Sequence, residues 1–203
     1  MADYEAVLFD FDGVIIDSEP VHFACWREVL APLGVTMTWD DYRAHCIGVA
    51  DEEVLERWSR QSGGEVTAGR MWQEYGRKND LFVARMVADP PIPAATRRLL
   101  EDLDALKLAV VSSSGRAEVE PILVAGGVRQ HFADCVFRED VANYKPHPEP
   151  YLLAARRLGI RRALVVEDSE AGLQSGRAAG FDVVAVDNAK NTAALVRARL
   201  GLG

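Results

Sequence analysis

The chain has 203 residues, of which 49% are hydrophobic and 27% are charged. This composition is typical of a soluble globular protein, and the length suits one large domain or a main domain with a smaller one inserted. The formal net charge of −8 and the lack of a basic run argue against nucleic acid as the main partner.

The cysteines and the first residues bear on the cellular compartment. Cys25, Cys46 and Cys135 are odd in number and far apart, so we expect no disulfide framework and a reducing compartment. The segment MADYEAVLF lacks the basic region and the long apolar run of a signal peptide, and no stretch approaches the roughly 20 apolar residues of a membrane span. We therefore expect a cytoplasmic protein with no membrane partner.

Five short apolar segments, rich in Val and Leu, do not alternate between polar and apolar residues. They predict strands buried on both faces of a parallel sheet, at residues 6–10, 108–113, 134–137, 163–168 and 182–187. Helical patterns at 117–127, 149–160 and 171–181 separate the last four strands. We expect the first of these helices to carry Pro121 early, where a missing amide costs little. Strand and helix alternate, which predicts an α/β fold with a doubly wound, Rossmann-like parallel sheet.

The interval between the first two strands is too long for a plain crossover. Residues 17–88 contain no convincing strand, but they carry amphipathic helical patterns at 21–34, 51–63 and 67–86. The segment DPPIP at 89–93 then reads as a stiff linker. We predict a catalytic core formed by residues 1–16 and 89–203, with an all-helical domain inserted at 17–88 and hinges near 13–17 and 88–93.

Polar side chains follow four of the predicted strands where those strands end. In doubly wound sheets this is the edge at which ligands bind. An unpaired carboxylate in such an apolar frame costs several kcal/mol, on the order of magnitude expected for buried charge, unless something compensates it. The residues at this edge are Asp10, Asp12, Ser112, Ser113, Ser114, Lys145, Glu167 and Asp168.

This set of side chains suits phosphoryl transfer. Asp10 and Asp168 offer hard oxygen ligands for Mg²⁺. A carboxylate can also act as a nucleophile and form an aspartyl phosphate. Lys145 and Ser112, with the metal, would spread the charge of the transferring group, and Asp12 would protonate the leaving alkoxide and then activate water. Each residue alone is more often a turn, cap or surface residue, but their combination at strand ends favours this chemistry.

Four segments carry a family resemblance. DFDGVIIDSEP, VVSSSG, NYKPHPEPY and VVEDSEAGLQSGRAAG resemble the four motifs of the haloacid dehalogenase-like hydrolases. The resemblance is to the β-phosphoglucomutase and sugar-phosphate phosphatase branch, in which a helical cap follows the first strand. It implies Asp10 as nucleophile, Asp12 as general acid/base, and Ser112 and Lys145 as phosphate ligands. It also implies Mg²⁺ held by Asp10, the Asp12 carbonyl and Asp168, with Glu167 as a supporting acid near the metal.

Other classes of protein use some of these residues. A halide leaves without a proton whereas a sugar alkoxide needs one, so Asp12 argues against a dehalogenase. A signalling receiver domain also forms an aspartyl phosphate, but it lacks a helical insert and its acceptor lies in the middle of the chain. A non-catalytic metal-binding protein would not need Asp12 or Lys145.

The cap is expected to select the substrate. Candidate substrate contacts are His22, Lys78 and Asn79 in the cap, with Ser113, Ser114 and Arg116 in the core. Similar mutases carry a phosphate-binding arginine in the segment that aligns with residues 48–53, where this chain has Asp51, Glu52 and Glu53. We therefore predict a monomeric phosphatase of a small, sugar-type phosphorylated metabolite, with β-phosphoglucomutase as the alternative.

Overall fold

The computed structural model describes residues 4–47, 49 and 51–202 of the chain. The chain divides into two compact units. The first, here the core unit, ends at Ser18 and resumes at Val87; the second, the helical unit, is Glu19–Met86. The boundaries expected from sequence fell after residues 16 and 88. Within the described residues, no helix has the length and apolar character needed to cross a membrane.

The core unit is built on a five-stranded parallel sheet with the order β3-β2-β1-β4-β5. The first strand is central, and Leu8 pairs with Ala109 on one side and with Val165 on the other. All three residues are fully buried, as expected for strands covered on both faces. The predicted fold class is confirmed. The strands are β1 (Ala6–Phe9), β2 (Lys107–Val111), β3 (Asp134–Val136), β4 (Ala163–Glu167) and β5 (Asp182–Ala185).

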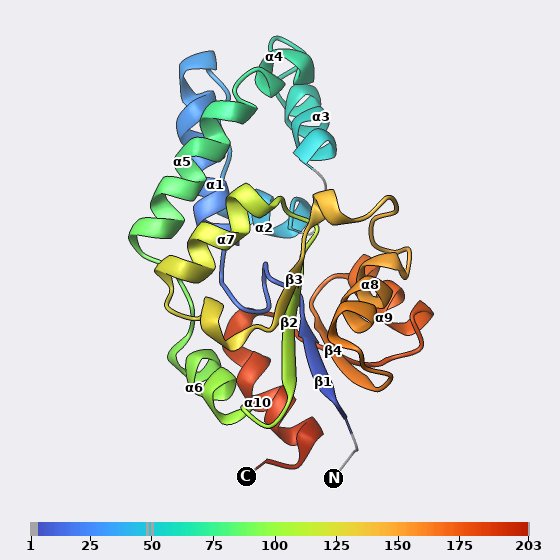
Figure 1. The fold of residues 1–203 in the computed structure, drawn as a ribbon. Coiled ribbons are helices and arrows are strands. Elements are labelled where there is room, and N and C mark those ends of the chain that lie inside the picture. The colour runs from blue at the N-terminus through green and yellow to red at the C-terminus, as the bar shows by residue number, and fades with distance from the viewer. Residues whose placement is uncertain (1–3, 48, 50, 203) are drawn as a thin grey trace. The chain divides into compact units, whose positions relative to one another are not determined.

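Helices cover both faces of this sheet. Figure 1 shows α8 and α9 on one face and α6, α7 and α10 on the other. The helices are α6 (Ala94–Asp102), α7 (Arg116–Ala125), α8 (Glu149–Leu158), α9 (Glu170–Ala178) and α10 (Ala189–Leu200), with 3₁₀ turns at Arg129–His131 and Arg138–Asp140. The expectation for Pro121 was wrong, because α7 begins at Arg116 and the proline lies inside the helix. Its missing amide leaves the carbonyl four residues earlier without its usual helical donor.

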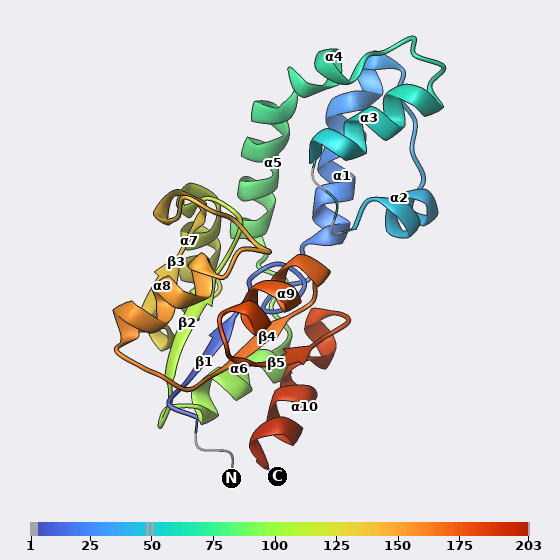
Figure 2. The same ribbon diagram turned by 90° about the vertical axis from the view of Figure 1, so that its right-hand side faces the viewer.

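The helical unit contains five α-helices among its described residues (Figure 2). Its interior is aromatic: the Trp26 ring meets the Trp58 ring edge-on, and both side chains are almost fully buried. The helices are α1 (Glu19–Leu30), α2 (Trp39–His45), α3 (Asp51–Gln61), α4 (Ala68–Trp72) and α5 (Tyr75–Ala88), with a 3₁₀ turn at Ala31–Leu33.

Two features of the helical unit differ from the sequence-based expectation. The pattern at 67–86 forms two helices, because the Glu74 amide bonds to the Met71 carbonyl three residues back and so makes a turn. Trp72, the last residue of α4, is 39% exposed and stacks on Tyr75, the first residue of α5. Helix α2 was not predicted, although Thr38 caps it by accepting a hydrogen bond from the Asp41 amide.

Candidate active site

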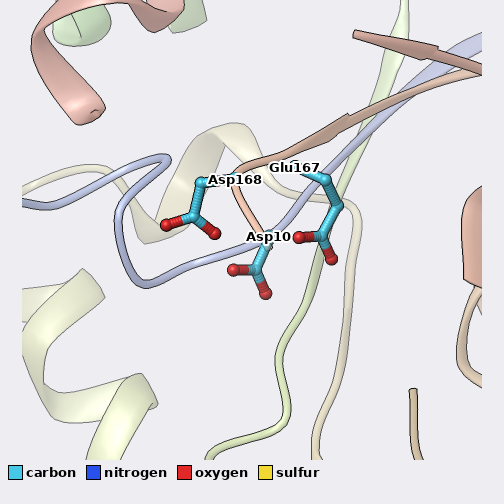
Figure 3. A group of neighbouring side chains, drawn as sticks. All are labelled: Asp10, Glu167 and Asp168. Atoms are coloured by element: carbon cyan, nitrogen blue, oxygen red, sulfur yellow. The ribbon is translucent and has the colours of Figure 1, made fainter. Parts of the chain in front are cut away.

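The parallel sheet brings acidic side chains from adjacent strands together at its carboxyl edge. Asp10 directly follows β1, Glu167 ends β4 and Asp168 comes next. Figure 3 shows these three carboxylates grouped at the ends of the two strands. One oxygen from each lies within 4.8 Å of the others. The strand-end acids predicted from sequence are therefore neighbours in space.

Lys145 joins two of these acids. Its side chain, only 5% exposed, comes from the loop between β3 and α8. Its ammonium nitrogen, Nζ, donates to Asp10 Oδ1 at 2.7 Å, to Glu167 Oε1 at 2.5 Å and to the Val111 carbonyl at 2.8 Å. An ammonium has three protons, so every donor of Lys145 is in use. Binding a phosphate would require one of these bonds to be exchanged.

The net effect of burial and nearby charges is to raise the pKa of both members of this pair, Asp10 and Lys145. Burial, followed by repulsion from Glu167, raises the pKa of Asp10 well above its usual value, although Lys145 acts against this. Burial alone would lower the pKa of Lys145, but the Asp10 and Glu167 carboxylates outweigh it and raise that pKa. Lys145 therefore stays charged at neutral pH.

Glu167 is fully buried and held by residues that were not among the predicted site residues. Oε1 accepts a hydrogen bond from the Tyr151 hydroxyl at 2.6 Å, and Oε2 accepts one from the Ser169 hydroxyl at 3.2 Å. A Cβ atom at Gly172 would lie only 1.9 Å from the Glu167 carboxyl group, so the glycine makes room for it. The sequence marks Ser169 as a candidate helix N-cap, which is a signal of its position next to the site. Tyr151 is an aromatic residue within a helix, and nothing in the sequence indicates that its hydroxyl group reaches Glu167.

Asp12 is held by two hydroxyl groups. The Ser18 hydroxyl donates to Oδ1 at 2.7 Å, and the Ser114 hydroxyl donates to Oδ2 at 3.2 Å. Ser18 is fully buried and was not predicted as a site residue, since serine before a helix usually reads as a cap. Of the other serines in the run, Ser112 is buried and its oxygen accepts from the Ser114 amide at 3.0 Å, whereas Ser113 is exposed.

Arg116 lies at the start of α7 and is engaged by acids of its own unit. Its guanidinium lies 3.3 Å from Asp140 and 3.5 Å from Glu120, and it stacks over the Phe137 ring at 4.4 Å. The positive charge that was predicted to contact substrate is thus balanced within the core unit.

Asp168 completes the acidic group. Loss of water from around its carboxylate, then repulsion from Glu167 and Asp12, raises its pKa to about 7. Gly13 has φ +68°, and a Cβ atom there would lie 1.9 Å from Asp168 Oδ2. Glycine adopts this backbone conformation readily, and because it has no side chain it leaves room for the Asp168 carboxylate.

The acidic group fits a divalent cation. With all three deprotonated, Asp10, Glu167 and Asp168 together carry three negative charges, and Lys145 supplies one positive charge. A doubly charged ion would balance the remaining two, and carboxylate oxygens are ligands that hard divalent cations prefer. Because both Glu167 oxygens accept hydrogen bonds from protein, Asp10 and Asp168 are the better placed of the three to bind a metal directly.

The candidate substrate contacts of the helical unit lie around α1 and α5. The His22 ring stacks on Phe82 with centroids 3.9 Å apart. Lys78 is almost fully buried and lies 3.3 Å from Asp51 Oδ2. The side-chain oxygen of Asn79, Oδ1, is buried and has no hydrogen-bond partner among the described residues. Of the aligned segment 48–53, residues 48 and 50 lie outside the described residues.

Comparison with known proteins finds a matching family model and similar proteins. A model described as haloacid dehalogenase-like hydrolase matches residues 7–186. A phosphorylated carbohydrates phosphatase of Thermotoga maritima is 31% identical over 186 residues, covering 88% of this chain and 82% of the relative. A fructose-1-phosphate phosphatase of Escherichia coli is 30% identical, covering 90% of this chain and 96% of the relative.

A solved structure shares both fold and sequence. It is CbbY from Rhodobacter sphaeroides in complex with xylulose-1,5-bisphosphate, which is 27% identical with a TM-score of 0.69 and covers 90% of this chain and 85% of its own. The relatives therefore include enzymes named for phosphorylated carbohydrates and for fructose 1-phosphate, and a protein solved with a sugar bisphosphate.

The clash at Gly13 gives a test of the metal site. Gly13→Ala should weaken Mg²⁺ binding about ten- to hundredfold, the range seen when the support of a metal ligand is lost, because the new Cβ displaces Asp168. The measurement is isothermal titration calorimetry of the folded protein. Gly159→Ala is the matched control, since Gly159 has φ +64° with open space around its Cβ position. Both variants should lose about 1–2 kcal/mol of stability to the left-handed backbone. Unchanged Mg²⁺ affinity in folded Gly13→Ala would contradict the role given to Asp168.

His22 gives a test of the electrostatics of the helical unit. Burial, then the Lys78 ammonium, lowers the pKa of His22 well below 6.5. The unfolded chain therefore binds a proton near pH 6.5 that the folded chain does not, and stability should fall as the pH drops below 6.5. His22→Gln should remove this contribution, which is at most about 1.4 kcal/mol per pH unit. Urea denaturation at several pH values measures the slope.

The decisive comparison is between the slope of stability against pH in His22→Gln and the slope in the unmodified protein. If His22→Gln and the unmodified protein show equal slopes between pH 7 and pH 5, the histidine is protonated in the folded state and the assignment is wrong.

Proposed function

Because the chain belongs to the haloacid dehalogenase-like hydrolase family, we propose that it is a Mg²⁺-dependent phosphomonoester hydrolase acting through an aspartyl phosphate. The substrate is a small, sugar-type phosphate, and the enzyme works as a monomer in the cytoplasm. One observation carries the proposal: the Asp10 carboxylate is bound to a buried lysine, and Asp12, two residues on, is oriented by two hydroxyls.

The named relatives support the substrate class. The relatives from Thermotoga maritima and Escherichia coli are named as phosphatases of phosphorylated carbohydrates and of fructose 1-phosphate. The likeness of this chain covers 82% of the first relative and 96% of the second. A sugar phosphomonoester is accordingly the substrate class that we assign.

The proposed reaction has two displacement steps. An Asp10 oxygen attacks the phosphorus atom, the bond from phosphorus to the sugar oxygen breaks, and the Asp12 carboxylic acid gives its proton to that oxygen. Asp12, now a carboxylate, takes a proton from water as the water oxygen attacks the phosphorus of the aspartyl phosphate. Inorganic phosphate leaves, and Asp10 is regenerated as a carboxylate while Asp12 again carries its proton.

Other residues position these groups. Lys145 fixes the Asp10 carboxylate through its 2.7 Å bond and adds a positive charge beside the site of attack. Ser112 keeps its hydroxyl proton available for a phosphate oxygen, because its bond with the Ser114 amide uses only the oxygen. Asp10 and Asp168, with the Asp12 carbonyl, would hold Mg²⁺, which when bound offsets the negative charge of the transferring phosphoryl group.

We also assign the helical unit as a cap that selects the substrate and excludes water from the reaction. The chain passes between the units at Ser18 and at Val87, so the proposed hinges are the segments 13–17 and 88–93. A mutase must hold a bisphosphate by its far phosphate. Arg116 is already paired with Asp140, and residues 51–53 are acidic, so neither offers a free cation for a second phosphate. Both observations favour hydrolysis over the mutase reaction.

The acid role of Asp12 predicts a dependence on the leaving group. Asp12→Asn should slow phosphoenzyme formation from a sugar phosphate far more than from p-nitrophenyl phosphate, since p-nitrophenolate leaves without a proton. Rapid-quench measurement of phosphoenzyme formation separates this step from hydrolysis. Asp17→Asn, which removes another acid of the first motif, one that pairs with the exposed Lys190, is the control. Equal slowing for both substrates would contradict the acid/base assignment.

The fate of the phosphate separates the phosphatase from the mutase. With β-glucose 1-phosphate, a trace of the 1,6-bisphosphate and Mg²⁺, we expect free phosphate to accumulate and little glucose 6-phosphate to form. Enzyme-coupled assays follow the two products separately, and a panel of sugar monophosphates then ranks the substrates. Rapid formation of glucose 6-phosphate with almost no phosphate release would establish the mutase instead.

A further inference from the structure

The interior of the helical unit contains a buried cation. Lys78, on α5, is only 2% exposed. Its ammonium lies over three aromatic rings, 5.3 Å from the centroid of Trp26, 5.7 Å from that of Tyr75 and 5.6 Å from that of Phe82. These rings attract the cation through their π faces and hold it in one place.

Asp51 is the counter-ion of this lysine. Its Oδ2 lies 3.3 Å from the Lys78 ammonium, and its Oδ1 accepts a hydrogen bond from the Trp26 indole nitrogen at 2.9 Å. The Asp51 side chain is 30% exposed while that of Lys78 is 2% exposed. The acid is therefore the member of the pair that meets solvent, and the exposed Glu52 and Glu53 follow it at the start of α3.

Stability alone is a weak explanation for this pair. Taking the Lys78 ammonium and much of the Asp51 carboxylate out of water costs about as much as their attraction returns, so an apolar pair of similar volume would serve the helical unit at least as well. What the ion pair does provide is a defined charge at the surface. A ligand that approaches there meets a carboxylate and not an ammonium.

We propose that Asp51 is a specificity-determining residue, which occupies the Lys78 ammonium and so restricts this enzyme to substrates with one phosphate. This inference rests on the proposed function, in which the helical unit selects the substrate. A second phosphate dianion would be repelled by Asp51 and denied Lys78. Without the Asp51 carboxylate, the same lysine is an available cation for that phosphate.

The experiment compares two substrates that differ only in the second phosphate. We would measure kcat/KM for β-glucose 1-phosphate and for glucose 1,6-bisphosphate, and take the ratio of bisphosphate to monophosphate. Asp51→Ala removes both the charge and the cover over Lys78, and it should raise this ratio at least roughly tenfold, as expected for gaining a charge-assisted contact. Asp51→Asn keeps the shape and the acceptor for Trp26, so it serves if the alanine variant does not fold; its ratio should also rise.

Two controls assign the change to Lys78. In the double variant Asp51→Ala with Lys78→Met, the ratio should return to that of the unmodified enzyme, because the freed cation is gone. Asp40→Asn removes one exposed acid of the same unit, which pairs with the exposed Arg43, and should leave the ratio unchanged. Circular dichroism verifies that each variant is folded.

The other possible outcomes distinguish failure of this inference from failure of the proposed function. If folded Asp51→Ala and Asp51→Asn keep the ratio of the unmodified enzyme, or if the double variant keeps the raised ratio, Asp51 does not act through Lys78 and the inference is wrong. If either of these results is found and the unmodified enzyme still hydrolyses the monophosphate, the proposed function stands without the inference. If it hydrolyses neither substrate nor any other sugar phosphate, the proposed function fails and the inference falls with it.

Discussion

The buried ammonium of Lys145 is the interaction on which the site depends. It bonds to Asp10 at the end of β1, to Glu167 at the end of β4 and to the Val111 carbonyl of β2. Removing one partner of such a buried group usually costs about 3–5 kcal/mol, because a charge is left uncompensated. The loop that carries Lys145 is thereby tied to three strands, and the carboxylates can lie close together in an apolar frame.

The order of the strands explains why distant parts of the sequence meet here. Since β1 is central, the residue after it lies between the ends of β2 and β4. The site is also tightly filled: at Gly13 and Gly172 an added Cβ would lie within 2 Å of a carboxyl group. The acids are thus positioned by the backbone around them as well as by their hydrogen bonds.

The chemistry at the sheet edge could be predicted from sequence because it follows from topology. Buried parallel strands were recognisable from their unbroken apolar runs, and their carboxyl ends share one edge, so Asp10, Lys145 and Asp168 could be grouped. The supporting hydroxyls of Ser18 and Tyr151 could not, since their roles depend on side-chain directions that spacing does not specify.

The helical unit was harder to predict than the core. The pair between Asp51 and Lys78 joins residues on two helices, and its existence depends on how those helices pack. The turn at Glu74 breaks a pattern that continued through it, because helical periodicity in the sequence does not record a local change of direction. Local propensity likewise failed at Pro121, where tertiary packing keeps a helix intact around a proline.

The distribution of indole rings has a spectroscopic consequence. All four tryptophans, at positions 26, 39, 58 and 72, lie within Glu19–Met86, and the core unit has none. Intrinsic fluorescence excited at the red edge of the indole band therefore reports on the helical unit alone. Trp26 donates its indole hydrogen to Asp51 and has the Lys78 ammonium over its ring, so its emission is sensitive to the charge beside it. The protein thus carries an internal optical probe of one of its two units, with no label required.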